Sequence, residues 1–261
     1  MRRKSLGVVL TALALAACGG GESTDLDPDA AVIQITSEGG FVPVEFALSN
    51  GPRYTVLGDG RLIFQGVQTM QFPGPLVPPY MVAQLSDSQM NAVLAMVEDM
   101  GLADIVEESD DSALNFVADA STEVIRFWDD NGEHTYSVYA LGIQEEPSER
   151  NETFLELIET LDRFTAEAPA EPYSSEEIRV VAGFGFVDPE FGDEREWPLE
   201  DEAFAEWTEL PNGWYCRTYE SDVLTSFEGA TQATVWTHPD GTSNPITLLV
   251  RPLIPGETAC G

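Results

Sequence analysis

The residues of this chain best suited to bind a ligand directly are polar side chains gathered at one predicted tight turn. They surround Gly132 and are Asp129, Asp130, Asn131 and Glu133. Calcium takes about six to eight oxygen ligands, which carboxylates and amides supply. The spacing does not match the D-x-[DN]-x-[DN]-G calcium loop, so a solvated acidic turn is the alternative. We therefore treat this turn as a candidate cation site, with calcium as the candidate cofactor.

Other residues that perform chemistry are sparse. The acidic segments at 107–111 and 188–194 leave the same two alternatives open, an ion site or a solvated loop. The chain has two histidines, His134 and His238, and each lies beside a predicted turn, where a solvated side chain is expected. The chain has no G-x-S-x-G, G-x-x-x-x-G-K-[ST] or H-E-x-x-H motif. The sequence thus predicts no catalytic residue.

The start of the chain has the pattern of an export signal. Three basic residues at 2–4 precede an apolar stretch of 12 residues, which is shorter than the ~20 residues of a membrane-spanning helix. Four residues then resemble the lipobox of bacterial prolipoproteins: Leu15-Ala16-Ala17-Cys18. The resemblance implies that residues 1–17 are removed as a signal peptide. It also implies that Cys18 becomes the first residue and carries a diacylglycerol, with palmitate as an acyl chain.

This resemblance implies a location as well. Lipid on Cys18 would hold the chain on the cell membrane, facing the extracytoplasmic side. Residues 18–31 are small, polar and acidic, and they are predicted to form a flexible tether between the lipidated cysteine and a folded body.

The two remaining cysteines, Cys216 and Cys260, are predicted to form a disulfide. Exported proteins fold in an oxidising compartment, where leftover cysteines usually pair. The pair has no C-x-x-C spacing, which argues against a metal or redox site. The bond would close a loop of 45 residues and stabilise the fold by about 4 kcal/mol.

The charge of the chain is strongly negative. The formal net charge is −34, and beyond residue 4 the chain has nine arginines, no lysine and 46 acidic residues. Such a surface repels phosphate backbones, which argues against nucleic acid as a partner. Because the acidic residues are spread along the chain, solubility in salty surroundings explains them more simply than a dedicated cation-binding surface does.

Hydrophobic periodicity predicts an α+β fold, with antiparallel sheets and hairpins packed by a few amphipathic helices. Strands are expected at 32–36 and 41–48, and hairpins turn near residues 58–60, 131–132 and 240–241. One helix begins at Ser86, where Gln89 completes a capping box, and ends before Gly101. A second helix carries an apolar stripe over 154–164.

Composition predicts two subdomains. The segment EAPAEPYSSEE, at 167–177, contains two prolines together with small and charged residues, which is typical of a linker. An α+β domain over 32–166 would precede it. A smaller α+β domain with the disulfide would follow over 178–261.

Three segments of the body also carry a resemblance. They are LGDGRLIF at 57–64, LSDSQMNAVLAMVEDMGL at 85–102, and the ending R-P-L-[IL]-P…C at 251–260. In these the chain resembles uncharacterised lipoproteins of high-GC Gram-positive bacteria, which implies location and layout and no activity.

Three functions stay open at this point. The first is a non-catalytic protein that binds an envelope protein or a glycan, or serves as a scaffold. The second is a receptor for a cation or a small solute, and the third is an enzyme of unrecognised type. An exposed apolar patch would favour the first, and a pocket with converging polar groups would favour the second.

Overall fold

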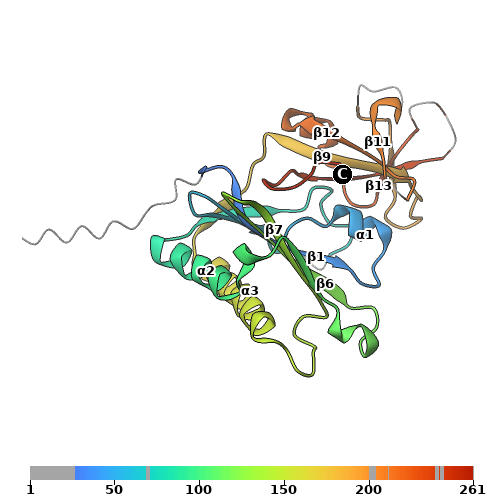
Figure 1. Cartoon of the computed structure of the whole chain (residues 1–261). Coiled ribbons are helices and arrows are strands. Elements are labelled where there is room, and N and C mark those ends of the chain that lie inside the picture. The colour runs from blue at the N-terminus through green and yellow to red at the C-terminus, as the bar shows by residue number, and fades with distance from the viewer. Residues whose placement is uncertain are drawn as a thin grey trace, which may run out of the picture.

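The computed structural model describes residues 27–68, 71–199, 204–210, 212–238, 241 and 244–260. Two β-sheets and two longer helices make up this part of the chain, which confirms the predicted α+β class (Figure 1). The predicted signal peptide, Cys18 and most of the predicted tether lie outside the described residues. Within the described ranges, no helix is both long and apolar enough to cross a membrane.

The first sheet has eight strands in the order β5-β7-β6-β1-β2-β3-β4-β8. Neighbouring strands are antiparallel except β5 and β7, which are parallel. The hairpins predicted near residues 58–60 and 131–132 are present as β2–β3 and β6–β7. The strands are β1 (Ala31–Gly39), β2 (Tyr54–Leu57), β3 (Arg61–Gln65), β4 (Tyr80–Gln84), β5 (Glu107–Asp110), β6 (Ser121–Asp129), β7 (Gly132–Tyr139) and β8 (Ala170–Pro172).

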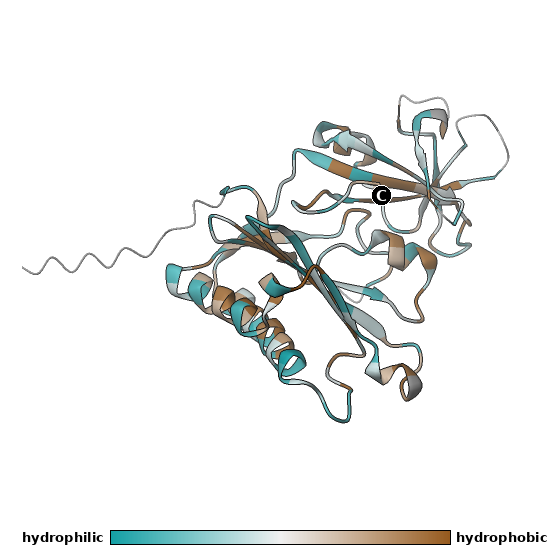
Figure 2. Cartoon of the chain, viewed as in Figure 1, coloured by the Kyte–Doolittle hydropathy of each residue, from teal (hydrophilic) through white to brown (hydrophobic). Residues whose placement is uncertain are grey.

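Helices α2 (Asp87–Asp99) and α3 (Glu149–Glu167) cover one face of this sheet (Figure 1). The predicted capping box is confirmed, because Ser86 Oγ accepts from the backbone N–H of Gln89 and the Gln89 side chain accepts from the N–H of Ser86 at 2.9 Å. Both helices carry hydrophilic and hydrophobic residues along their length (Figure 2). The hydrophobic ones form the main core with the sheet; its members include Ile33, Ile35, Tyr54, Val56, Leu62, Val93, Val97, Phe154, Leu157 and Leu161.

The second sheet has six strands in the order β10-β13-β14-β9-β12-β11. The predicted hairpin between β13 and β14 is present, and its turn lies largely outside the described residues. A separate core covers one face of this sheet and contains Trp207, Phe227 and Trp236. The strands are β9 (Glu177–Phe184), β10 (Asp193–Arg195), β11 (Thr208–Glu209), β12 (Tyr215–Glu220), β13 (Thr234–Trp236) and β14 (Ile246–Pro252). Short 3-10 turns complete the described chain at Leu102–Asp104, Ser112–Asn115, Phe204–Glu206 and Ser221–Phe227.

The segment 41–48 is not a strand, contrary to the sequence prediction. Most of helix α1 (Val44–Ser49) lies within it. A strand here would have no open edge beside β1, because β1 is already paired with β2 on one side and with β6 on the other. Pro43 precedes the helix with φ of −55°, a value that the proline ring favours and that suits a helix start.

The predicted linker at 167–177 is also partly ordered into the first sheet. It contains β8, which pairs with β4 at the sheet edge, where Pro172 costs no ladder hydrogen bond on the open side. The first sheet therefore extends past the predicted domain boundary at residue 166. The chain crosses to the second sheet between β8 and β9.

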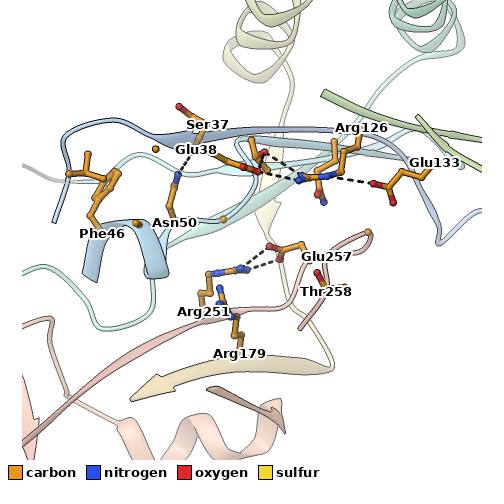
Figure 3. A pocket seen from close by; sticks show the side chains of 17 residues that line it. Ser37, Glu38, Phe46, Asn50, Arg126, Glu133, Arg179, Arg251, Glu257 and Thr258 are labelled. Atoms are coloured by element: carbon orange, nitrogen blue, oxygen red, sulfur yellow. Dashed lines mark hydrogen bonds and ion pairs between the residues drawn. The ribbon is translucent and has the colours of Figure 1, made fainter. Parts of the chain in front are cut away.

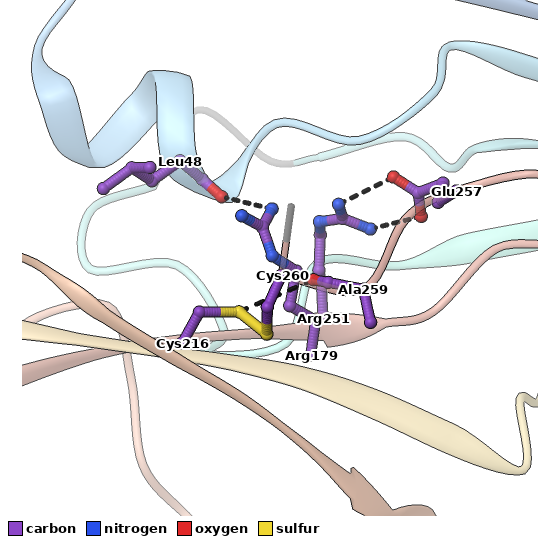
Figure 4. The surroundings of a disulfide bond; sticks show 7 residues. All are labelled: Leu48, Arg179, Cys216, Arg251, Glu257, Ala259 and Cys260. Atoms are coloured by element: carbon purple, nitrogen blue, oxygen red, sulfur yellow. Dashed lines mark hydrogen bonds and ion pairs between the residues drawn. A yellow bond between two sulfur atoms is a disulfide. The ribbon is translucent and has the colours of Figure 1, made fainter. Parts of the chain in front are cut away.

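The C-terminal tail, residues 253–260, connects the two sheets. Ile254 is buried against Ala31 and Leu57 of the first sheet. Gly256 has φ of +87°, and a Cβ there would lie 2.8 Å from the Cβ of Ala31, so only glycine fits this approach. At the end of the tail Cys260 pairs with Cys216 of β12, as predicted, with Cα atoms 5.6 Å apart (Figure 4).

Candidate functional site

A cleft of about 610 Å³ lies between the two sheets (Figure 3). Strands β1, β6 and β7 line it from the first sheet, and β9 and β14 line it from the second. Helix α1 and the C-terminal tail close its sides through Phe46, Ala47 and Glu257. The cleft is therefore built by segments distant in sequence.

Strand alternation explains why polar side chains reach the cleft. Along β1, Ile33 and Ile35 face the helices, whereas Gln34 and Thr36 point to the other side of the sheet. The same alternation on β6 buries Ile125 under the helices and directs Arg126 to the cleft. At these positions one face of the first sheet serves the main core and the other serves the cleft.

The wall from the first sheet carries one arginine and two carboxylates. Arg126 Nη2 lies 3.1 Å from Glu38 Oε1, and Arg126 Nε lies 3.7 Å from Glu133 Oε1. A further hydrogen bond of 3.4 Å joins Arg126 Nη1 to Thr36 Oγ1. These three charged groups sum to one negative charge, so this wall has a net negative charge.

The wall from the second sheet carries two arginines and one carboxylate. Arg179 of β9 and Arg251 of β14 are direct partners across the antiparallel pair. Arg251 makes a two-pronged ion pair with Glu257, with distances of 2.6 and 2.7 Å (Figure 4). Arg179 donates from Nη1 to the backbone carbonyl of Leu48 at 3.3 Å, and its pKa is lowered, first by burial and then by the charge of Arg251. This wall has a net positive charge.

The polar atoms of these two arginines are incompletely paired. The Nε atoms of Arg179 and Arg251 are both buried without a hydrogen-bond partner. Arg251 is only 4 % exposed, so water does not compensate its lost partners easily. A buried donor without a partner is costly for the protein alone, so the residues of this wall leave part of its hydrogen-bonding capacity unsatisfied.

A second, apolar groove adjoins the cleft along the segment 39–51. Its volume is about 1070 Å³, and it shares Val42 and Phe46 with the cleft. Several of its side chains are strongly exposed, with Phe41 at 87 % and Val67 at 95 %. The exposed apolar surface and the charged cleft therefore share one border, which is α1.

The predicted cation turn lies at the β6–β7 hairpin, but its oxygens point to different partners. Asp129 Oδ1 accepts from the backbone N–H of Asn131 at 2.7 Å and bonds His134 Nε2 at 2.9 Å. Glu133 accepts from the indole N–H of Trp128 at 3.2 Å and faces the cleft, and Asp130 is exposed. Among the described residues, no three His, Cys, Asp or Glu side chains converge as a metal site would require. Calcium binding at this turn stays a prediction.

The other acidic segments serve local structure. In 107–111, Glu108 pairs with Arg150 at 2.7 Å, and Asp110 accepts from Asn151 Nδ2 at 2.6 Å. In 188–194, Asp188 Oδ1 accepts two backbone N–H groups of its own loop. The oxygens of these segments are thus used as hydrogen-bond acceptors within the protein.

His134 is buried, contrary to the expectation of a solvated turn histidine. Its side chain is 6 % exposed, stacks on Phe127 and bonds the carbonyl of Ile105 and the carboxylate of Asp129. The carbonyl of Ile105, followed by Asp129, raises the pKa of His134, and the His134 hydrogen bond lowers the pKa of Asp129. When His134 is protonated, its ion pair with Asp129 stabilises the β6–β7 hairpin. His238 lies edge-on to Phe204, with ring centroids 5.5 Å apart.

No family model matches this chain, and comparison with curated proteins and with solved structures likewise finds no match. The site is therefore interpreted from its own geometry.

Sequence reasoning missed the arginines of the cleft. A usable signal was present, because Arg179 and Arg251 each interrupt an apolar strand in a chain with only nine arginines beyond residue 4. A charged residue inside an apolar strand indicates either a strand at the edge of a sheet or a functional site. The sequence could not show that the two strands pair side by side.

Proposed function

We propose that this protein is a non-catalytic binding lipoprotein, anchored on the extracytoplasmic side of the cell membrane, that takes a small polar solute in the cleft between its sheets. The observation that carries the proposal is the cleft, about 610 Å³ in volume and lined by charged groups from both sheets. Pockets for small ligands have volumes of roughly 300–1,000 Å³ and a few converging polar groups. Of the hypotheses left open by the sequence, this geometry favours a solute receptor.

The two carboxylates with a shifted pKa serve the protein's own hydrogen bonds. Among the described residues, the carboxylates with a clearly shifted pKa are Asp110 and Asp129, and both are lowered by hydrogen bonds. Lowered values keep these groups ionised, which suits structure and binding.

The anchor rests on the start of the sequence. The residues Leu15-Ala16-Ala17-Cys18 fit a lipidation site, and the first described residue is Asp27. A lipid at Cys18 would then hold an acidic body close to the membrane while its charge keeps it off anionic headgroups.

Cys18→Ala is expected to remove the protein from the membrane. The full-length chain would be expressed in a bacterium that processes prolipoproteins and labelled with an alkyne analogue of palmitate. Wild type should carry the label and sediment with membranes, whereas Cys18→Ala should lose the label and move to the soluble fraction. The double variant Cys216→Ala/Cys260→Ala serves as the control and should stay labelled. Persistence of Cys18→Ala in membranes after a high-salt wash would argue against the anchor.

Solute binding in the cleft is tested with Ala47→Trp. Ala47 is an exposed residue of α1 that lines the cleft, so a tryptophan there narrows the site without entering a core. A thermal-shift panel of sugars, amino acids, organic acids, calcium and magnesium is measured on the detergent-solubilised protein. At least one solute should raise the melting temperature of wild type, through mass action, and not that of Ala47→Trp.

Ala92→Trp is the matched control, since Ala92 is an exposed residue of α2 on the other side of the first sheet. It should respond as wild type does. A flat response of wild type to the whole panel would contradict solute binding.

Docking of an envelope protein is the second candidate. The exposed apolar side chains around the adjoining groove, such as Phe41 and Val67, favour it. A flat solute panel would shift support to this candidate.

A further inference from the structure

The two arginines of the second sheet form an arrangement that is unfavourable for the protein alone. Arg179 and Arg251 are directly opposite on neighbouring antiparallel strands, a position in which like charges repel. Among the described residues, Glu257 is the one carboxylate paired with them, so one positive charge is left over in a largely buried place. Unfavourable local arrangements of this kind are expected mainly at functional sites.

The opposite wall has the complementary imbalance. Glu38 and Glu133 share Arg126, so one negative charge is left over there. Figure 3 shows this group on one side of the cleft and Arg179 with Arg251 on the other. The cleft thus offers a positive pole and a negative pole that face each other.

The charge of the whole molecule decides which ligands can approach. With a formal net charge of −34, the protein repels simple anions at long range. Simple cations are attracted, but they would meet Arg179 and Arg251 inside the cleft. A solute with both charges and no net charge avoids the long-range repulsion and matches both poles at short range.

We propose that the cleft binds small zwitterionic solutes, with a carboxylate on Arg179 and Arg251 and an ammonium group toward Glu38 and Glu133. This inference rests on the proposed function, since it names the ligand class of the same site. Arginine suits the carboxylate end because its planar N–H groups match two oxygens. A bound zwitterion would stabilise the folded protein because it neutralises the surplus charge on each wall of the cleft.

The test uses melting curves of the full-length protein in detergent, followed through its five tryptophans. Glycine, 4-aminobutyrate and 6-aminohexanoate vary the distance between the two charges of a zwitterion. Acetate and butyrate carry the negative charge alone, and butylamine carries the positive charge alone. Glucose is the neutral polar solute. At least one zwitterion should raise the melting temperature well above the shift given by any singly charged or neutral solute.

Arg179→Gln separates binding from folding. Removing the uncompensated arginine should leave the melting temperature of the free protein unchanged or higher, while zwitterion affinity falls about ten- to hundredfold, as expected for a lost charge-assisted hydrogen bond. Arg163→Gln, an exposed arginine of α3, is the matched control and should bind as wild type does. The double variant Glu38→Gln/Glu133→Gln should lose the preference for zwitterions over acetate.

Each outcome bears on a different claim. A response to glucose, acetate or butylamine without a response to zwitterions would overturn the zwitterion inference and leave solute binding intact. Equal zwitterion binding by wild type and Arg179→Gln would also overturn it. No response to any solute, in this set or in the wider panel tested with Ala47→Trp, would contradict solute binding itself.

Discussion

Glu257→Ala is expected to lower the free energy of unfolding by about 3 to 5 kcal/mol, the usual cost of leaving one partner of a buried ion pair alone. Glu257 accepts two hydrogen bonds from Arg251 and one, of 3.0 Å, from the backbone N–H of Ile254. The side chains of Arg251 and Glu257 are 5 % and 11 % exposed. Without this carboxylate, Arg179 and Arg251 would both be positive and uncompensated.

The measurement is urea unfolding followed by tryptophan fluorescence. Glu159→Ala, at an exposed position of α3, is the control and should change the free energy of unfolding by no more than about 0.5 kcal/mol. Arg251→Met/Glu257→Leu should recover much of the loss, because apolar residues of similar volume often replace a buried pair without penalty. A loss below about 1 kcal/mol for Glu257→Ala would mean that the pair is hydrated in solution and contributes as a surface pair does.

Removing the disulfide is expected to lower the free energy of unfolding by a similar amount. Cys216 and Cys260 are 44 positions apart, and loop-closure entropy for that separation gives about 4 kcal/mol. The bond also holds the tail that carries Glu257, which precedes Cys260 by three positions. Unfolding of Cys216→Ala/Cys260→Ala should therefore show a loss of about 4 kcal/mol, and reduced wild type should behave like this variant.

The two changes should not be additive. If the disulfide keeps Glu257 beside Arg251, the triple variant Glu257→Ala/Cys216→Ala/Cys260→Ala should lose less than the sum of the separate losses, by about 0.5 to 3 kcal/mol. Strict additivity would show that the tail stays in place without its covalent bond. Cys18→Ala, which leaves both of these cysteines intact, should unfold like wild type.

Features that depend on neighbours in sequence were predictable. Helix α2 begins at its capping box because Ser86 and Gln89 satisfy each other's backbone groups three positions apart. The β6–β7 hairpin forms around Asn131-Gly132 because glycine accepts the positive φ of that turn. The disulfide followed from composition, since the predicted lipidation of Cys18 leaves two cysteines, which can pair in one way.

Features that depend on which strands become neighbours were not predictable. The segment around α1 has the alternation of a strand, yet both edges of β1 are occupied, so it forms a helix instead. Likewise β8 joins the edge of β4 although Pro169 and Pro172 indicate a linker. His134 is buried where its ring bonds the carbonyl of Ile105, and this contact joins segments 29 positions apart.

The cleft illustrates the difference most clearly. From the sequence alone come the α+β class with antiparallel sheets, the hairpins, the start of helix α2, the paired cysteines and the acidic charge. The strand order places Arg179 directly opposite Arg251, and the tail brings Glu257 to them. Local propensity acts over a few residues, whereas a charged site between two sheets exists only once distant strands have been paired, and that pairing is decided by the packing of the whole chain.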